Sequence, residues 1–341
     1  MRRMMCFLVM SLLLVSISTV LAAQEQPFFA GKTIRIIVGY GPGGGFDTFA
    51  RLVARHIPRH ISGNPTVIVQ NMSGAGGAVA FNYVYSRAKP DGLTWVTSDG
   101  ALILSKILEL PGPEFDAEKY PWLGVGMSSH RVCIVMTRTG ITSAEQFLHF
   151  REPVRLAATS PGDAVHIIPA IMSEAVGANF KIIVGYDGTA DMRMALQAGE
   201  ADGQCSSWES MKVKAADMLA RNDAIPVLQC GYERHLDLPD VPNIFDFPMS
   251  EEAKVMLKLV IGPGILAKLY AVPPGTPPER LKALRQAFAD TLKDPGLLAE
   301  AQKMKLPISY KSPDEVAEII RGMMATPPEL KKKVAKIAGA K

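Results

Sequence analysis

A cluster of glycines close to the N-terminus has the composition of a backbone site for an anion. Residues 41–47 read GPGGGFD and follow a β-branched run, Ile34 to Val38, which is typical of a strand buried on both faces. Glycine lacks a Cβ atom, so a ligand can approach the backbone closely. Asp47 can cap a following helix, whose first N–H groups would then point out of the loop. The stretch therefore predicts an anion-binding turn between a strand and a helix.

The same loop also fits a dinucleotide-binding pattern, which the neighbouring residues disfavour. Gly39, Gly41 and Gly44 satisfy G-x-G-x-x-G after a strand. However, Pro42 lies inside the turn, and the next strand ends at Asn71 where an acidic residue should bind the ribose. We therefore expect no NAD. A tight turn without any ligand remains open as an alternative interpretation.

Two further strand ends carry similar loops. Residues 66–69 form a second strand that leads into 71–77, NMSGAGG, and residues 93–97 form a third that ends in 98–100, SDG. The carboxyl ends of parallel strands meet at one edge of a sheet, where ligands of open α/β sheets bind. We therefore expect the three loops to lie side by side there.

The N-terminus has the features of a secretory signal peptide. Arg2 and Arg3 precede an apolar run that ends in small residues, which predicts a signal over residues 1–23. Cys6 precedes the apolar core, so a lipoprotein form is not expected. Without Arg2 and Arg3, the 37 basic residues against 33 acidic ones leave a net charge of about +2. This charge implies no nucleic-acid partner, and we expect no membrane insertion of the mature chain.

Length and cysteine content suggest two domains and few covalent constraints. About 318 residues after the signal exceed one ordinary core. Cys133, Cys205 and Cys230 remain, so at least one thiol is free. We expect all three to act as small buried hydrophobic residues. A disulfide between Cys205 and Cys230 is left open, because spacing alone does not support it.

Catalytic signatures are lacking in the sequence. His56 and His60 have metal-like spacing but lack the glutamate of a zinc protease motif, so we expect a solvated helix end. No G-x-S-x-G elbow of a serine hydrolase occurs. We therefore expect no enzyme, no metal and no cofactor.

The order and spacing of several motifs are more specific than any one of them. Residues 41–47, 67–77 and 88–96 read GPGGGFD, VIVQNMSGAGG and AKPDGLTWV. Together they resemble the N-terminal half of the extracytoplasmic solute receptors of tripartite tricarboxylate transporters, the Bug-type binding proteins. The resemblance continues through residues 185–190 and 195–202, then 238–242 and 271–277, and covers nearly all of the mature chain.

The second half departs from the family pattern at four places. Val184-Gly185 replaces valine-proline, and Asp187 replaces lysine. Ser206 stands where many members have aspartate, and residues 160–166 shorten the family's G-x-G-[ST] loop. These departures concern contacts at the far end of a ligand.

The resemblance implies a two-domain α/β periplasmic-binding-protein architecture, a Venus flytrap of doubly wound sheets joined by a two-crossover hinge. The implied first domain covers residues 30–129 plus 236–341, and the second covers 130–235. The alternation of strands and helical stretches also favours α/β sheets. Residues 36–40 and residues 182–186 both read IIVGY. This echo gives weak support for two facing half-sites. Residues 257–270 are broken by Gly262, Pro263 and Gly264, so we expect no membrane span there.

Ligand-binding residues are expected in both domains. In the first domain, N–H groups at the two glycine loops would hold one carboxylate. In the second, small polar and aromatic residues would close on the other end. The expected set is Gly43, Gly44, Gly45, Phe46, Asp47, Ser73, Gly74, Ala75, Gly76, Gly77, Ser98, Ser160, Gly162, Tyr186, Gly188, Thr189, Ser206 and Trp208.

Some of these residues have equally ordinary structural roles. Thr189 could simply cap a helix, Trp208 could pack in the core, and Asp47 fits a helix cap better than a ligand contact. Asp163, Asp187 and Glu209 would repel a dianion if they faced the cleft, so each is expected to be exposed. One of them inside the cleft would instead imply an amine or a hydroxyl donor on the ligand.

The resemblance implies a monomeric periplasmic protein that captures a small organic carboxylate and delivers it to membrane permease subunits of a tripartite transporter. A receptor that feeds a sensor kinase is an alternative from another functional class. An exported α/β enzyme is a third.

Overall fold

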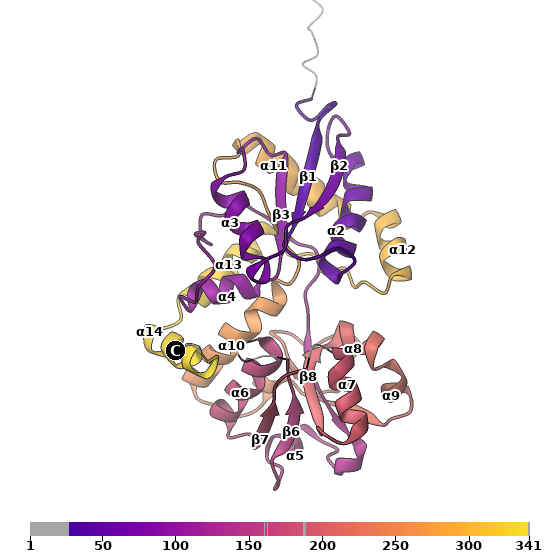
Figure 1. Ribbon diagram of the computed structural model, residues 1–341, viewed down its shortest axis with the longest axis vertical. Coiled ribbons are helices and arrows are strands. Elements are labelled where there is room, and N and C mark those ends of the chain that lie inside the picture. The colour runs from indigo at the N-terminus through magenta and orange to yellow at the C-terminus, as the bar shows by residue number, and fades with distance from the viewer. Residues whose placement is uncertain (1–26, 160, 162, 187–188, 340–341) are drawn as a thin grey trace, which may run out of the picture.

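The computed structural model contains two α/β lobes, one above the other in Figure 1. It describes residues 27–339, apart from 160, 162, 187 and 188, and also leaves out the side chains of Thr189 and Ala190. The expected signal peptide, residues 1–23, therefore lies outside the described residues. Each lobe is built on one five-stranded sheet, and the predicted α/β fold class is confirmed.

The first sheet has the strand order β2-β1-β3-β10-β4. The bounds are β1 Thr33–Val38, β2 Thr66–Asn71, β3 Thr94–Ser98, β4 Trp122–Val125 and β10 Leu269–Ala271. β1 pairs in parallel with both β2 and β3, as the buried β-branched run predicts. β10 comes from the C-terminal part of the chain and lies antiparallel between β3 and β4.

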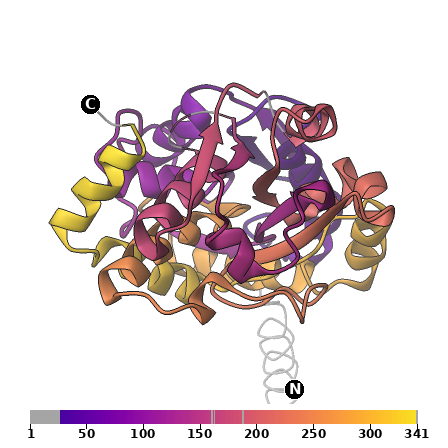
Figure 2. The same ribbon diagram turned by 90° about the horizontal axis from the view of Figure 1, so that it is seen from below.

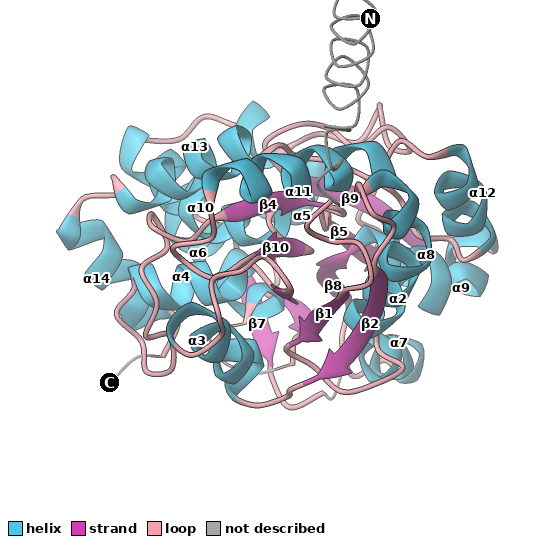
Figure 3. Ribbon diagram, turned by 90° about the horizontal axis from the view of Figure 1, so that it is seen from above, coloured by secondary structure: helices cyan, strands magenta, loops and turns pink. Residues whose placement is uncertain are grey.

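Helices cover both faces of the first sheet, as Figure 3 shows from above. They are α2 Gly45–His56, α3 Ala78–Ser86, α4 Ala101–Ile107, α11 Pro278–Thr291, α12 Pro295–Lys303 and α13 Pro313–Met324, together with the short 3-10 helices η1 Ile57–His60 and η2 Ala75–Gly77. Buried Phe49 of α2 and Phe288 of α11 both pack against Tyr270 in β10. This aromatic group ties the C-terminal segment into the first lobe.

The second sheet has the order β7-β6-β8-β5-β9 and uses one continuous stretch of chain. The strands are β5 Arg131–Met136, β6 Val154–Ala157, β7 Phe180–Ile183, β8 Gly203–Ser207 and β9 Ala224–Cys230. The helices of this lobe are α5 Ala144–Leu148, α6 Ala164–Val176, α7 Thr189–Ala198, α8 Trp208–Lys214 and α9 Ala216–Ala220. β6 is parallel to β7 and β8, whereas β5 is antiparallel to β8 and β9.

The two sheets share one spatial arrangement of strands, and this corrects the interpretation of the sequence echo. β1 and β6 occupy the second place in their sheets, and β2 and β7 occupy the edge. The echoed residues fall on β1 and β7, which are not equivalent strands. The echo therefore reflects two buried strands of similar composition, and it gives no support for two matching half-sites.

Helix α10, Glu251–Ile265, connects the lobes. It packs against α4 of the first lobe and α6 of the second, and the last helix, α14 Pro328–Ile337, also lies against α6. Figure 2 shows α14 in yellow at the edge of the molecule. Chain segments 126–130 and 231–250 also pass between the sheets. The domain boundaries at residues 129/130 and 235/236 remain a prediction.

A disulfide forms, but not between Cys205 and Cys230, the pair left open above. Cys133 of β5 bonds Cys205 of β8, with a Cα–Cα distance of 3.9 Å, and Cys230 is a buried free thiol. Cys133 and Cys205 face each other directly in the antiparallel ladder, a pairing that only the strand register reveals. Cys230 lies on the neighbouring strand, with its sulfur 3.8 Å from that of Met172. Its expected role as a small buried side chain is confirmed.

Along α11, Leu284 and Phe288 are fully buried at helical spacing. Among the described residues, no helix combines the length and the apolar character needed to span a bilayer.

Candidate functional site

The first two glycine loops lie against each other, as their parallel strands predict. A Cβ atom on Gly39 would lie only 2.8 Å from the Cα of Gly77. The hydroxyl of Tyr40 donates a hydrogen bond of 3.1 Å to the carbonyl of Gly76. Asn71, at the end of β2, donates through Nδ2 to the carbonyl of Tyr40 at 2.8 Å. The starts of α2 and α3 are thus held side by side at the carboxyl edge of the sheet.

The second loop requires glycine for its backbone conformation and its packing. Gly74, Ala75, Gly76 and Gly77 all have positive φ. A side chain at Gly77 would place its Cβ 2.1 Å from the Oγ of Ser98, the last residue of β3. Ser98 therefore lies beneath the loop and is fully buried. The contact between Ser98 and Gly77 thus places the third loop, residues 98–100, against the second, residues 71–77.

Asp47 organises the first loop from within the helix, which corrects its expected role as the N-cap. The N-cap of α2 is Gly44, and Asp47 lies in the first turn with only 3% of its surface exposed. Its carboxylate accepts hydrogen bonds from the N–H of Gly43 at 2.9 Å, from Arg51 at 2.9 Å and from Asn71 at 3.0 Å. The hydrogen bond from Arg51 is the main cause that lowers the pKa of Asp47 to about 2. The carboxylate is thus directed at the protein itself.

A buried lysine supports the first loop from below. The ammonium of Lys268 lies 3.2 Å from the ring centroid of Phe46, and that ring stacks on Tyr40 at 4.4 Å. Only 7% of Lys268 is exposed. Burial lowers its pKa to about 8, against the opposing carboxylates of Asp99 and Glu209. No sequence pattern predicted a cation at this position.

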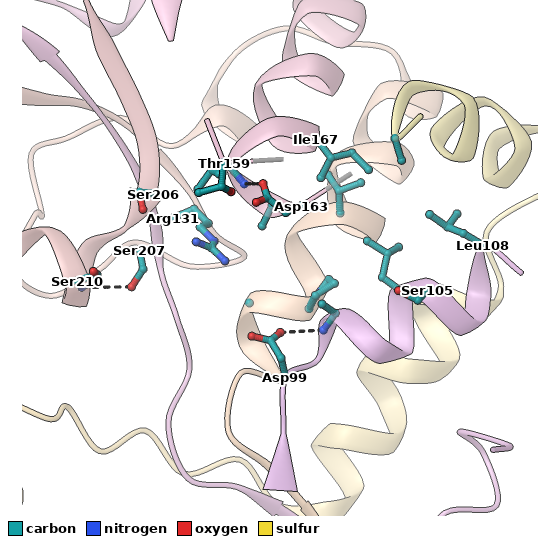
Figure 4. Close-up of a pocket in the computed structure, with 18 of the residues that line it drawn as sticks. Asp99, Ser105, Leu108, Arg131, Thr159, Asp163, Ile167, Ser206, Ser207 and Ser210 are labelled. Carbon is teal, nitrogen blue, oxygen red and sulfur yellow. Dashed lines mark hydrogen bonds between the residues drawn. The ribbon is translucent and has the colours of Figure 1, made fainter. Parts of the chain in front are cut away.

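A cavity of about 400 Å³ lies between the two lobes. Residues of β5, β8, α6 and the segment before α6 form its second-lobe wall, and residues of α4, α10 and the β3–α4 loop form the other. Tyr40 reaches it from the first glycine loop. Figure 4 shows its two halves: Arg131, Thr159, Ser206, Ser207, Ser210 and Asp99 at the polar end, and Ser105, Leu108 and Ile167 at the other.

Arg131 is the unpaired charge of this cavity. It is the first residue of β5, and its side chain points toward the space opposite Asp99 (Figure 4). Its Nε is buried without a hydrogen-bond partner, and within the described part of the chain the guanidinium forms no ion pair. A buried donor without an acceptor is costly. The cavity therefore offers a guanidinium suited to an anionic guest.

Asp99 has partners inside the protein. It accepts a hydrogen bond of 2.8 Å from the N–H of Ala101 at the start of α4. Burial raises the pKa of its carboxyl, against that hydrogen bond and the positive charges of Lys268 and Arg131. Lys268 thus offsets the negative charge of Asp99 behind the cavity wall.

Residues 49–335 match the model of a protein family described as the tripartite tricarboxylate transporter family receptor, TctC. The chain belongs to this family. The predicted resemblance is thereby confirmed over most of the mature sequence. Members of the family are solute-binding receptors.

Individual relatives of the receptor are distant in sequence but similar along their whole length. A UPF0065 protein from the tcbD-tcbE intergenic region of Pseudomonas sp. (strain P51) is 22% identical over 304 residues, which cover 88% of this chain and 85% of the relative. A TctC solute-binding protein from Polaromonas superposes with a TM-score of 0.72 at 19% identity, covering 89% and 98% of the two chains. Rpa4515 of R. palustris with adipate superposes with a TM-score of 0.63 at 20% identity, covering 90% and 97%.

The expected ligand-binding residues of the receptor lie in different environments. Of those described, Ser206 lines the cavity. Gly43, Gly44 and Gly45 are exposed in the first loop and are not among its lining residues. Trp208 is buried and donates through Nε1 to Asp237 at 3.2 Å, so it packs in the core. Tyr186 lies near Glu200, with 3.4 Å between its hydroxyl and the carboxylate.

The remaining expected residues divide into two groups. Ser73, Gly74, Ala75, Gly76 and Gly77 form the second loop, which contacts the first through Tyr40. Ser160, Gly162 and Gly188 lie outside the described residues, and Thr189 begins α7 without a described side chain.

Two acidic residues expected at the surface are instead used inside. Asp163 caps α6, accepting from the N–H groups of Val165 and His166, and it lines the cavity. Glu209 accepts from the Oγ of Ser207 at 2.7 Å and from the N–H of His130 at 3.2 Å. Backbone and hydroxyl donors satisfy both carboxylates, which is why they can face the interior. Asp187, the third, lies outside the described residues.

The histidine pair on α2 is not a solvated helix end. His56 is 8% exposed and contacts Glu300 of α12 at 2.7 Å, and His60 contacts Asp294 at 2.9 Å. These contacts join η1 and α2 to α12. In the described part of the chain, no group of three or more metal-type side chains could hold an ion.

Arg131, Asp99 and Lys268 were not expected in the site. Arg131 lies at the end of the expected crossover, Asp99 lies in the third strand-end loop, and Lys268 follows the apolar segment of α10. The position of Asp99 after a parallel strand could have identified it. The other two carry no local signal, because only the tertiary fold brings them near the glycine loops.

Proposed function

We propose that this receptor captures a small organic carboxylate in the periplasm and delivers it to the membrane subunits of a tripartite tricarboxylate-type transporter. The apolar N-terminal run over residues 1–23 supports export. Family membership supports a binding role without catalysis. The receptor would act as a monomer without a cofactor.

One observation carries the choice of a carboxylate. The cavity between the lobes is lined by Arg131, whose guanidinium is unpaired, and by Tyr40, which connects the cavity to both glycine loops. The N–H groups at the starts of α2 and α3 add partial positive charge at the two glycine loops that Tyr40 joins. A carboxylate can satisfy such donors from both lobes at once, and this favours closure of the cleft around the ligand.

The test uses Gly44→Leu in the first loop. Gly44 has φ of −75°, and an added Cβ would meet nothing closer than the Gly41 carbonyl at 3.7 Å, so the fold accommodates a side chain. The leucine should occupy the approach to the helix N-terminus and abolish carboxylate binding, while the thermal transition stays nearly unchanged. Gly322→Leu on α13 is the matched control, because its Cβ also meets open space.

Binding is measured by thermal shift against mono-, di- and tricarboxylates. A ligand at a hundredfold excess over Kd stabilises the native state by about 2.7 kcal/mol. Affinity retained by Gly44→Leu would contradict the role of the first loop. The absence of any shift with the wild-type protein, freshly refolded to remove bound ligand, would contradict the carboxylate receptor itself.

A further inference from the structure

The cavity has an apolar arm that a compact tricarboxylate would not use. Its wall is formed by Leu104 of α4, Leu108 just after that helix, Ile167 of α6 and Val260 of α10, and Ala338, just after α14, also lines the cavity. Ser105 contributes a small polar group on the α4 side, facing Ile167 across the arm (Figure 4). A carboxylate placed there would lose its hydration without gaining a cation.

The charges of the cavity lie at its other end. Arg131 provides a cation without an internal partner, whereas the acids nearby are already engaged: Asp99 by Ala101 and Lys268, and Asp163 by the backbone of α6. The wall thus presents one unpaired positive group and, on the opposite side, an uncharged surface of leucine, isoleucine and valine. Such a division matches an amphiphilic anion.

We propose that the receptor selects a monocarboxylate with an apolar body, an aryl or branched alkyl group, whose carboxylate pairs with Arg131 and whose body fills the arm between α4, α6 and α10. This inference rests on the proposed function and narrows it, because citrate and other compact polyacids would be poor ligands. Arg131 then determines the charge of the ligand, and the arm determines its body.

The first experiment separates the charge from the body. Isothermal titration calorimetry compares 3-phenylpropanoate with its neutral amide, 3-phenylpropanamide. The wild-type protein should bind the acid at least about tenfold more tightly, as expected for a charge-assisted hydrogen bond. Arg131→Gln should reduce this ratio to less than about twofold, and Arg131→Lys should give an intermediate ratio. Arg87→Gln, an exposed arginine on the far end of α3, should leave it unchanged.

The second experiment fills the arm without touching Arg131. Ser105→Leu adds volume at the cavity wall. It should weaken 3-phenylpropanoate at least about tenfold and leave the much weaker binding of propanoate within about twofold. Leu298→Asn, a partly exposed residue of α12, is the control. Because Ser105→Leu leaves Arg131 in place, it tests whether the apolar body of the ligand occupies the arm even where Arg131→Gln fails to fold.

The outcomes distinguish this inference from the proposed function. Tighter binding of citrate or succinate than of 3-phenylpropanoate would overturn the apolar-body inference and leave the carboxylate receptor intact. An acid-to-amide ratio that survives in a folded Arg131→Gln would overturn the role of Arg131. If the protein binds no carboxylate at all, both the proposed function and the apolar-body inference are wrong.

Discussion

At the scale of single residues, polar groups of this receptor work mainly on its own loops. Asp47 connects the first glycine loop to β2 through Gly43, Arg51 and Asn71 and leaves no carboxylate oxygen directed at a ligand. Arg131 differs from Asp47 because its side chain is not used by the protein's own loops: its buried Nε has no acceptor among the described residues. Asp47 thus shapes the first loop, whereas Arg131 is the group that we propose for contact with a ligand.

Replacing Asp47 with alanine should lower the free energy of unfolding by about 1–3 kcal/mol, because the buried donors of Gly43 and Asn71 lose their acceptor. The folded pKa of about 2 lies below the ordinary value of 3.8. The stabilisation is therefore complete above the ordinary value and is lost as pH falls toward about 2. Urea titrations at several pH values measure it. Glu318→Ala, an exposed residue of α13, should change stability by less than about 0.5 kcal/mol.

A second prediction concerns His130 in the segment that joins the sheets. Its ring lies 5.4 Å from that of His235, and Gly231 packs directly against it. Burial and the nearby His235 lower the pKa of His130, against Glu209 and Glu233. The unfolded chain therefore binds more protons just below pH 6.5, so stability is full above pH 6.5 and falls as the pH drops from there. As the pH falls from 7.5 to 5.0, the free energy of unfolding should decrease less in His130→Gln than in the wild type. An equal decrease would contradict the assignment of this pH dependence to His130.

At the scale of elements, β5 is the central feature of the second lobe. It lies antiparallel between β8 and β9, carries Arg131 at its first position and bonds β8 through Cys133 and Cys205. The disulfide closes a chain segment of 72 residues. A cross-link of this length restricts the unfolded chain considerably. It also fixes the two strands that supply Arg131, Ser206 and Ser207 to the cavity.

Removal of the cross-link by Cys133→Ser with Cys205→Ser should lower the free energy of unfolding by about 2–5 kcal/mol. A reducing agent should have the same effect on the wild type and on Cys230→Ser, but none on the double variant. Urea unfolding with and without the reducing agent measures this. The native protein should show no reaction at Cys230, because burial raises the pKa of its thiol to about 12. Equal stability of the oxidised and reduced wild type would contradict the disulfide's role.

At the scale of the whole molecule, the cavity separates two lobes that are joined by extended segments and by α10. The polar end receives Tyr40 from the first lobe and Arg131 from the second. A ligand that bridges these groups stabilises the arrangement in which the lobes are closest.

Saturation with the carboxylate identified by the thermal screen should therefore reduce the radius of gyration in small-angle X-ray scattering. The Gly44→Leu variant, which should not bind, serves as the control and should give the same curve with and without ligand. An unchanged curve for saturated wild-type protein would rule out a closing receptor.

Local patterns predicted the fold better than the site. The β-branched run of β1 and the glycines after β1 and β2 were enough to predict adjacent parallel strands with neighbouring loops. The acids were misjudged because Asp163 and Glu209 are satisfied by backbone and hydroxyl donors that sequence does not reveal. Arg131 and Lys268 reach the site through β5 and β10, whose places in the sheets depend on long-range pairing. The Cys133–Cys205 bond depends on register for the same reason.

The place of β10 has a consequence for the order in which the chain can acquire structure during synthesis. β10 fills the gap between β3 and β4, yet it is translated only after every strand of the second sheet. The nascent polypeptide therefore carries an open edge on β3 and a solitary β4 until residues 269–271 emerge from the ribosome. Long-range pairing of this kind folds slowly. In a protein exported as proposed here, such a delay would keep the first lobe unfolded, and thus able to pass through a translocation channel, until most of the chain has been made.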